Sequence, residues 1–233
     1  ALPTFDGKLI IDGDGTGILT YGYDLVFRSE TEFRNITLKS TEQWKQMSGN
    51  GHNITFGDGF NTSGTPYTVT LHAGLYNQNM NLDQTVTVNG GVVAVQAGPY
   101  YINAGSERTW TGNFKLVVNG GRASFTGGDG YSGADGTFKL NGNILIEHNG
   151  GTISSINKGY MYQLNGKIVI VSKPETGLTV GTIMEHGAIV AKLNGVDATV
   201  NGTTVTFNED ANLVNGANFT SGDTYELAEA GIY

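Results

Sequence analysis

The fold is decided by residues 138–146, Phe-Lys-Leu-Asn-Gly-Asn-Ile-Leu-Ile, where an Asn-Gly pair separates two apolar runs. Such a pair is the strongest short-range signal for a two-residue β-hairpin. In a hairpin around Asn141 and Gly142, however, Lys139 would pair with Ile144, and the apolar side chains of the two strands would lie on opposite faces. The stretch therefore predicts a corner between strands of one coil, not a hairpin.

The same register test separates other Asn-Gly pairs. Asn165-Gly166 fails it, whereas Asn119-Gly120 is compatible with a hairpin. Two pairs in the tail, Asn194-Gly195 and Asn201-Gly202, also fit hairpins with one apolar face. The expected partners are Leu193 with Val196 and Ala191 with Ala198 in the first, and Val200 with Thr203, Ala198 with Val205 and Val196 with Phe207 in the second.

Comparable Asn-Gly corners recur through the middle of the chain, at Asn89, Asn119, Asn141, Asn165 and Asn194. The gaps between them are 30, 22, 24 and 29 residues, and solenoid repeats fall between about 20 and 50 residues. This spacing predicts a parallel β-solenoid, in which each strand pairs with the equivalent strand of the next coil.

Several segments combine an Asn-Ile-Thr-like strand with a Gly or Asp turn. They are residues 8–15 (Lys-Leu-Ile-Ile-Asp-Gly-Asp-Gly), 33–38 (Phe-Arg-Asn-Ile-Thr-Leu), 51–59 (Gly-His-Asn-Ile-Thr-Phe-Gly-Asp-Gly) and 141–146. On these segments, residues 1–172 resemble the right-handed parallel β-helix superfamily. The resemblance implies a bacterial surface or adhesin-like protein, because members that lack catalytic motifs are of that kind.

The character of the sequence changes after Ser172. We predict an all-β chain with a β-solenoid domain at residues 1–172 and a small C-terminal antiparallel β module or cap at 173–233. The boundary is placed at the turn-rich segment 173–177. A cap is expected because an open solenoid end exposes strand edges that invite polymerisation.

The composition excludes several classes of function. Thirteen Lys and Arg against 21 Asp and Glu give a net charge of −8, which argues against nucleic acid as a partner. No apolar run reaches the length of a membrane-spanning helix, so we expect no membrane insertion. Cysteine is absent, which excludes disulfides and thiolate sites without excluding secretion. A first residue that is Ala fits both a mature secreted chain and a trimmed one.

The motifs that could carry chemistry favour ordinary turns. Residues 12–17 begin like a calcium loop, but position 12 of that loop is Tyr23, which excludes an EF-hand and leaves calcium at Asp12 and Asp14 an open question. Residues 127–136 faintly match a calcium-binding nonapeptide, with Ser132 where Asp is required. The four histidines lack metal-ligand spacing. The adjacent acidic pair Glu209-Asp210 lies in the tail. We therefore predict no catalytic residues, no metal and no cofactor, although an enzyme stays open.

Aromatic residues are the better lead, because Tyr and Trp present a flat apolar face with a polar handle for stacking on sugars or proteins. Trp44 and Tyr76 precede the main cluster. The alternative for all of them is packing on strand faces between coils. The predicted ligand-binding residues are Tyr100, Tyr101, Trp110, Tyr131, Tyr160 and Tyr162.

These observations predict a non-catalytic secreted or cell-surface β-solenoid that displays loops and binds a glycan or an extracellular protein. Two alternatives remain. One is a polysaccharide lyase or glycoside hydrolase on a β-helix, and the other is a carbohydrate-binding β-sandwich built from hairpins throughout. The sequence leaves the oligomeric state undetermined.

Overall fold

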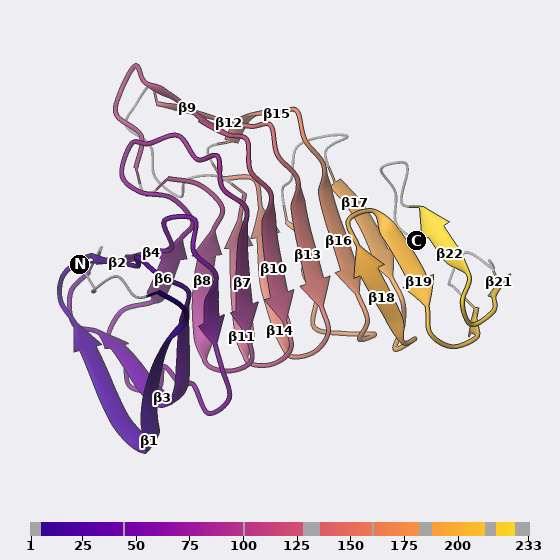
Figure 1. The fold of residues 1–233 in the computed structure, drawn as a ribbon, viewed down its shortest axis with the longest axis horizontal. Helices are drawn as coiled ribbons and strands as arrows, with labels where there is room; N and C mark the ends of the chain where they lie inside the picture. The colour runs from indigo at the N-terminus through magenta and orange to yellow at the C-terminus, as the bar shows by residue number, and fades with distance from the viewer. Residues whose placement is uncertain are drawn as a thin grey trace.

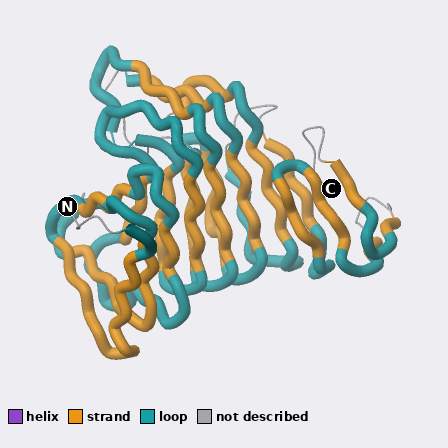
Figure 2. Tube along the Cα trace, viewed as in Figure 1, coloured by secondary structure: helices purple, strands orange, loops and turns teal. Residues whose placement is uncertain are grey.

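The protein is all-β. The computed structural model describes residues 6–43, 45–99, 101–127, 136–159, 161–181, 188–212 and 218–226. Within these ranges the sheets are mostly parallel, and small antiparallel sheets lie toward the C-terminus (Figure 1). Figure 2 shows strands and loops, and no helix, in the same part of the chain.

The largest sheet, sheet A, is parallel and runs along the long axis of the molecule (Figure 1). Its strands, in spatial order, are β1 (Leu9–Tyr21), β3 (Thr31–Ser40), β5 (Ile54–Phe56), β7 (Gln84–Val88), β10 (Phe114–Val118), β13 (Ile144–His148), β16 (Ile168–Ser172) and β17 (Ala188–Lys192). This spatial order follows the chain, so each strand of sheet A pairs with the one that the chain forms next in this sheet.

Two more parallel sheets follow the same rule. Sheet B holds β2 (Leu25–Val26), β4 (Met47–Ser48), β6 (Val69–His72), β8 (Val92–Gln96), β11 (Arg122–Thr126) and β14 (Thr152–Asn157). Sheet C holds β9 (Glu107–Trp110), β12 (Thr137–Leu140) and β15 (Met161–Leu164). From β7 to β15 the chain visits sheets A, B and C in turn three times, and each circuit, or rung, adds one strand to every sheet.

The register stacks like residues into columns along the axis. Val86, Leu116, Ile146 and Ile170 are successive partners across four strands of sheet A, and all of them are buried. Alternate residues of a strand point to opposite faces, so one face of each sheet supplies such columns to the core. The core continues through Phe33 and Phe56, whose rings are stacked 5.7 Å apart.

Strand β16 is buried on both faces, and its apolar sequence explains this burial. The residues of β16 are Ile-Val-Ile-Val-Ser, and the first four form an unbroken apolar run of the kind found in strands covered on both sides. Ile168 and Ile170 face the main core. Val169 and Val171 belong to a second apolar cluster with Ala198 and other residues of the C-terminal segment.

That C-terminal segment forms small antiparallel sheets. One sheet contains β18 (Ala198–Asn201), β19 (Thr204–Phe207) and β22 (Thr224–Glu226), and the other contains β20 (Ala211–Asn212) and β21 (Asn218–Phe219). The parallel pairing of sheet A extends past residue 172 to β17. The predicted division into two domains at residue 173 stays a prediction.

The hairpin predicted at Asn201-Gly202 is present, but its register differs from the predicted one. Val200 pairs with Val205, not with Thr203, and Ala198 pairs with Phe207. Gly202 has a φ of 60°, so it occupies the first turn position, which type II′ hairpins reserve for glycine. The turn is therefore Gly202-Thr203, one residue later than expected.

The hairpin predicted at Asn194-Gly195 is wrong. β17 lies in sheet A and β18 in the antiparallel sheet, so Ala191 and Ala198 are not strand partners. The turn itself is tight, with the amide of Val196 donating to the carbonyl of Leu193 at 3.1 Å. Asn119-Gly120 is likewise a corner, because it joins β10 in sheet A to β11 in sheet B.

The predicted corner series mixed two different columns of corners. Asn89, Asn119 and Asn149 follow strands of sheet A and are joined side chain to side chain. Asn141 and Asn165 follow strands of sheet C and are joined in the same way. The repeat between β7, β10 and β13 is therefore 30 residues, and it is 24 between β13 and β16.

Close approach of the rungs requires glycine at the corners that follow Asn89, Asn119, Asn141, Asn149 and Asn165, because a Cβ there would lie under 3.0 Å from backbone atoms. A Cβ on Gly142 would overlap the carbonyl oxygen of Gly112 one rung earlier. Gly121 also sits where a side chain would meet the backbone of Gly91, and its φ is 65°, a conformation that only glycine adopts at low cost. The β-sandwich alternative, which needs hairpins throughout, disagrees with the parallel pairing of sheets A, B and C.

Candidate functional site

The predicted aromatic residues lie in different environments. Trp110 is fully buried, with its ring edge-on to Phe114 at 5.9 Å. It packs in the core and cannot stack on a ligand, so this assignment is corrected. Tyr101 is half-buried. Tyr100, Tyr131 and Tyr160 lie outside the described residues, as does Trp44, and of Tyr162 only the backbone, in β15, is described.

Tyr101 forms a stacked pair with Tyr76. The two rings are 5.3 Å apart between centroids and 11° from parallel. Tyr76 is 51% exposed, and its hydroxyl donates a hydrogen bond of 2.6 Å to Oδ1 of Asn103. An exposed tyrosine fixed at its ring face and at its hydroxyl is a preorganised surface for a flat apolar partner.

The loop that carries Tyr76 is anchored to the next rung by its backbone. The amide of Asn77 donates to the carbonyl of Tyr101 at 2.6 Å, and Nε of Arg108 donates to the carbonyl of Asn77, also at 2.6 Å. In return, Oδ1 of Asn77 accepts the amide of Asn103 at 3.1 Å. Hydrogen bonds between the rungs therefore hold the tyrosine pair in place.

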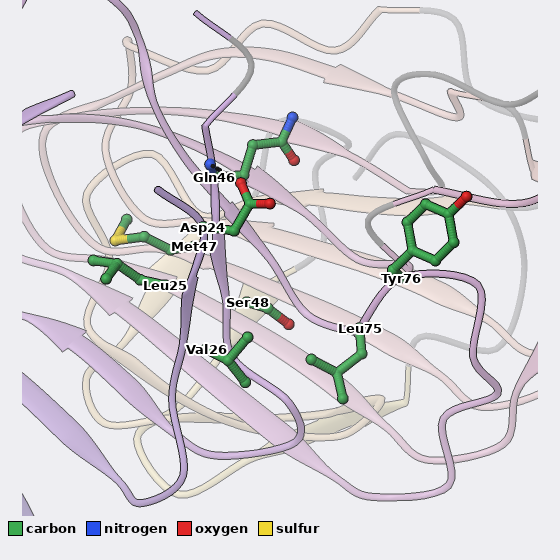
Figure 3. Close-up of a pocket in the computed structure, with 8 residues that line it drawn as sticks. All are labelled: Asp24, Leu25, Val26, Gln46, Met47, Ser48, Leu75 and Tyr76. Carbon is green, nitrogen blue, oxygen red and sulfur yellow. Dashed lines mark hydrogen bonds between the residues drawn. The ribbon is translucent and has the colours of Figure 1, made fainter. Parts of the chain in front are cut away.

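A groove of about 260 Å³ lies beside Tyr76. Its walls are Asp24–Val26 at β2, Gln46–Ser48 at β4, and Leu75 and Tyr76 from the loop after β6 (Figure 3). The rungs of β2 and β4 precede that of β6, whereas Tyr101 follows β8. Tyr76 therefore stacks on Tyr101 of the following rung and also lines the groove formed with the preceding rungs.

Strand alternation explains which side chains reach the groove. Met47 is buried in the core and pairs with Leu25, which packs against the same core. Their neighbours therefore point to the opposite face of sheet B. This alternation brings Asp24 and Gln46, which are 22 residues apart, side by side on the groove, as Figure 3 shows.

Two side-chain oxygens of the groove are acceptors. Oδ1 of Asp24 accepts the backbone amide of Gln46 at 3.2 Å. Oε1 of Gln46 is buried and has no hydrogen-bond partner. The lining contains neither Lys nor Arg. An uncharged group that carries hydroxyl or amide donors beside an apolar face suits these walls better than an anion does.

The loop after β6 also covers polar side chains of sheet B. Oγ of Ser48 donates to the carbonyl of Gly74 at 2.6 Å. Below the loop, burial lowers the pKa of His72 to about 3, an effect opposed by a hydrogen bond with the backbone of Pro99. His72 is therefore neutral and enclosed, so it serves the packing of this region.

A second buried histidine contacts a serine. Nδ1 of His148 lies 2.8 Å from Oγ of Ser172, and burial lowers the pKa of this histidine, opposed by a hydrogen bond with Gly151. Both side chains are buried, and Oγ of Ser172 also lies 3.2 Å from the carbonyl of Pro174. The pair joins β13 to β16 inside the protein.

The acidic residues singled out in the sequence hold turns together. Oε1 of Glu209 accepts the amide of Asp197, and Oδ1 of Asp210 accepts the amide of Ser221, both at 2.9 Å. Oδ1 of Asp12 accepts the amide of Asp14 at 3.0 Å inside a register shift of β1. Within the described ranges, no three His, Cys, Asp or Glu residues are placed to hold a metal ion.

Sequence reasoning missed the groove. Asp24 and Gln46 carry no motif, and what brings them together is the pairing of β2 with β4. Tyr76 stood in the sequence as an early aromatic, but its partner Tyr101 is 25 residues away. Only the register of sheet B, which pairs β2 with β4, would have shown that Asp24 and Gln46 lie together.

Comparison with known proteins gives no family for this chain: no family model, no curated protein and no solved structure matches it significantly. Among the described residues, none lies in a helix able to cross a membrane.

Proposed function

We propose that the parallel sheets form a β-solenoid of the parallel β-helix kind. Three features support this: the chain adds one strand per sheet in each circuit, like residues stack in columns, and Asn-Gly corners recur at the same places. A solenoid gives a stiff rod, because each rung is hydrogen-bonded to both neighbours along its length.

We further propose that the protein is a non-catalytic, adhesin-like binding protein of the cell surface or the secreted fraction, and that its ligand is a glycan. The observation that carries the proposal is the exposed, stacked Tyr76, which stands beside a groove with acceptor groups. Sugar rings offer a C–H face to an aromatic ring and hydroxyl donors to such acceptors.

The architecture suits binding better than catalysis. A site on rigid rungs keeps its geometry without a ligand, which reduces the ordering cost of binding. The histidines His72 and His148 are buried, and the carboxylates of Glu209 and Asp210 accept backbone amides. These histidines and carboxylates therefore stabilise the fold.

A glycan array tests the proposal. We expect the wild-type protein to bind a subset of glycans and Tyr76→Ala to lose most of that binding, because one ring stacked on a sugar contributes about 1 kcal/mol or more. Tyr67→Ala is the matched control, since Tyr67 is also exposed and does not line the groove.

Two results would contradict the proposal. One is binding that Tyr76→Ala leaves unchanged. The other is turnover: release of reducing ends or unsaturated products from a polysaccharide, abolished by replacing a single carboxylate, would identify an enzyme.

A further inference from the structure

Gln46, which lines the groove beside Tyr76, has a side-chain oxygen whose hydrogen bonding is incomplete. Oε1 of Gln46 is buried without a hydrogen-bond partner, although the side chain as a whole is half-buried and lines the groove. An unsatisfied buried acceptor costs about 1–3 kcal/mol. A rotation that turns this oxygen into the groove removes that cost, because water or a ligand can then donate a hydrogen bond to it.

The amide of Gln46 can turn toward the groove. The last torsion of a glutamine side chain has a broad energy profile, and side-chain rotations at binding sites are common on complex formation. The backbone amide of Gln46 is held by Asp24, so the rotation leaves the strand in place. Oε1 is buried in the structure, and after this rotation it would be available to a donor that enters between Gln46 and Tyr76.

The surfaces around this acceptor are apolar on one side and acidic on the other. Val26 and Leu75 supply aliphatic surface, Tyr76 supplies a ring, and Asp24 supplies a carboxylate (Figure 3). A matching ligand carries an N–H next to a small apolar group, has a ring face that can stack, and has hydroxyl groups within reach of a carboxylate.

We propose that the groove binds an N-acetylated amino sugar, with the acetamido N–H donated to Gln46, the acetyl methyl on the aliphatic surface and the sugar ring against Tyr76. This inference rests on the proposed glycan-binding function and narrows it to one chemical class. A uronic acid fits poorly, because its carboxylate would meet Asp24 with no cation in the lining.

The acetamido group can be isolated by comparing matched sugars. Titration calorimetry or ligand-observed NMR would measure N-acetylglucosamine and its short oligomers against glucose and its oligomers. We expect the N-acetylated series to bind about tenfold more tightly, a factor that one additional satisfied hydrogen bond explains. Gln46→Leu should remove this preference and leave the weaker binding of glucose oligomers.

The control is Gln78→Leu, which changes an exposed glutamine outside the groove and should keep the preference. Circular dichroism would confirm that each variant is folded.

Equal affinity for the two series in the wild-type protein, or a preference that survives Gln46→Leu, would overturn the inference while leaving glycan binding intact. Tighter binding of unacetylated glucosamine than of N-acetylglucosamine would overturn it too, since the charge on Asp24 would then select the ligand. If no sugar binds, both the inference and the proposed glycan-binding function are wrong.

Discussion

Nδ2 of Asn119 donates a hydrogen bond to Oδ1 of Asn89, 2.9 Å away on the preceding rung. Nδ2 of Asn149 repeats the contact with Asn119, also at 2.9 Å. At the other end, Nδ2 of Asn89 reaches Oδ1 of Asp58 at 3.4 Å. In this ladder each Asn donates from Nδ2 to the side-chain oxygen of the preceding rung. The first group of the ladder therefore only has to accept a hydrogen bond, and a carboxylate is a group that only accepts. The carboxylate of Asp58 therefore satisfies the donor of Asn89 at the end of the ladder.

Breaking the ladder in its middle should weaken the stack of rungs. Asn119→Ala removes one donor and one acceptor, and we expect the free energy of unfolding to fall by about 1–2 kcal/mol. Urea denaturation followed by circular dichroism would measure the change. Asn81→Ala is the control, because Asn81 is exposed and belongs to no ladder; a loss as large as that of Asn119→Ala would refute a special role for the ladder.

The corner glycines should be more sensitive still. Gly142→Ala places a methyl group on the carbonyl oxygen of Gly112, so the rungs cannot keep their spacing, and we expect a loss of several kcal/mol or failure to fold. Gly105→Ala is the control for backbone strain alone. Gly105 has a φ of 70° with open space around it, and its replacement should cost about 1 kcal/mol. Thermal unfolding of both variants would compare the two effects, and equal losses would contradict the steric argument.

The register test predicts the corner in residues 138–146, because an Asn-Gly pair that puts apolar residues on opposite faces cannot close a hairpin. The test is not sufficient, since Asn119 and Asn194 pass it and neither forms a hairpin. It could not assign corners to columns. Asn119 and Asn141 were placed in one series although they belong to different sheets, since both are Asn-Gly pairs after an apolar run. Only the pairing of strands shows that Asn119 stacks on Asn89 and Asn165 on Asn141.

The candidate site was less predictable than the fold. The sequence leaves the aromatic residues ambiguous between ligand contact and packing, and the structure buries Trp110 in the core. Nothing in the sequence separates Trp110 from Tyr76, because both occur next to short polar stretches. The difference arises from which face of a strand or loop each residue occupies, and that depends on contacts with the neighbouring rungs.

Glu32 should make stability depend on acid pH. Hydrogen bonds from Arg34 and Lys8 lower its pKa from an ordinary 4.5 to about 2, so the folded protein keeps this carboxylate charged where the unfolded chain protonates it. The resulting stability is complete above pH 4.5 and is lost as the pH falls toward 2. Denaturation midpoints measured across this range should decline less steeply for Glu32→Gln than for the wild-type protein.

Glu42→Gln is the control for the pH series, because Glu42 is exposed and its carboxylate takes part in none of the four ion pairs found in the described residues. Its pH profile should match that of the wild-type protein. A Glu32→Gln profile that is parallel to the wild-type profile between pH 5 and 2 would show that the three charged residues are not coupled in solution.

Trp110 separates the packing of the core from ligand binding. Its ring is fully buried against Phe114, so Trp110→Ala should lower the free energy of unfolding by about 3–5 kcal/mol. Trp110→Phe should lose less, because Nε1 has no hydrogen-bond partner to give up and an aromatic ring still fills most of the space. Glycan affinity should be unchanged in whichever variant folds, in contrast to Tyr76→Ala, which should lose affinity at nearly unchanged stability. Parallel denaturation and binding measurements on the three variants would test this. A folded Trp110→Phe protein with wild-type stability and impaired binding would show that the indole contacts the ligand, and the site would then have to be placed at sheet C.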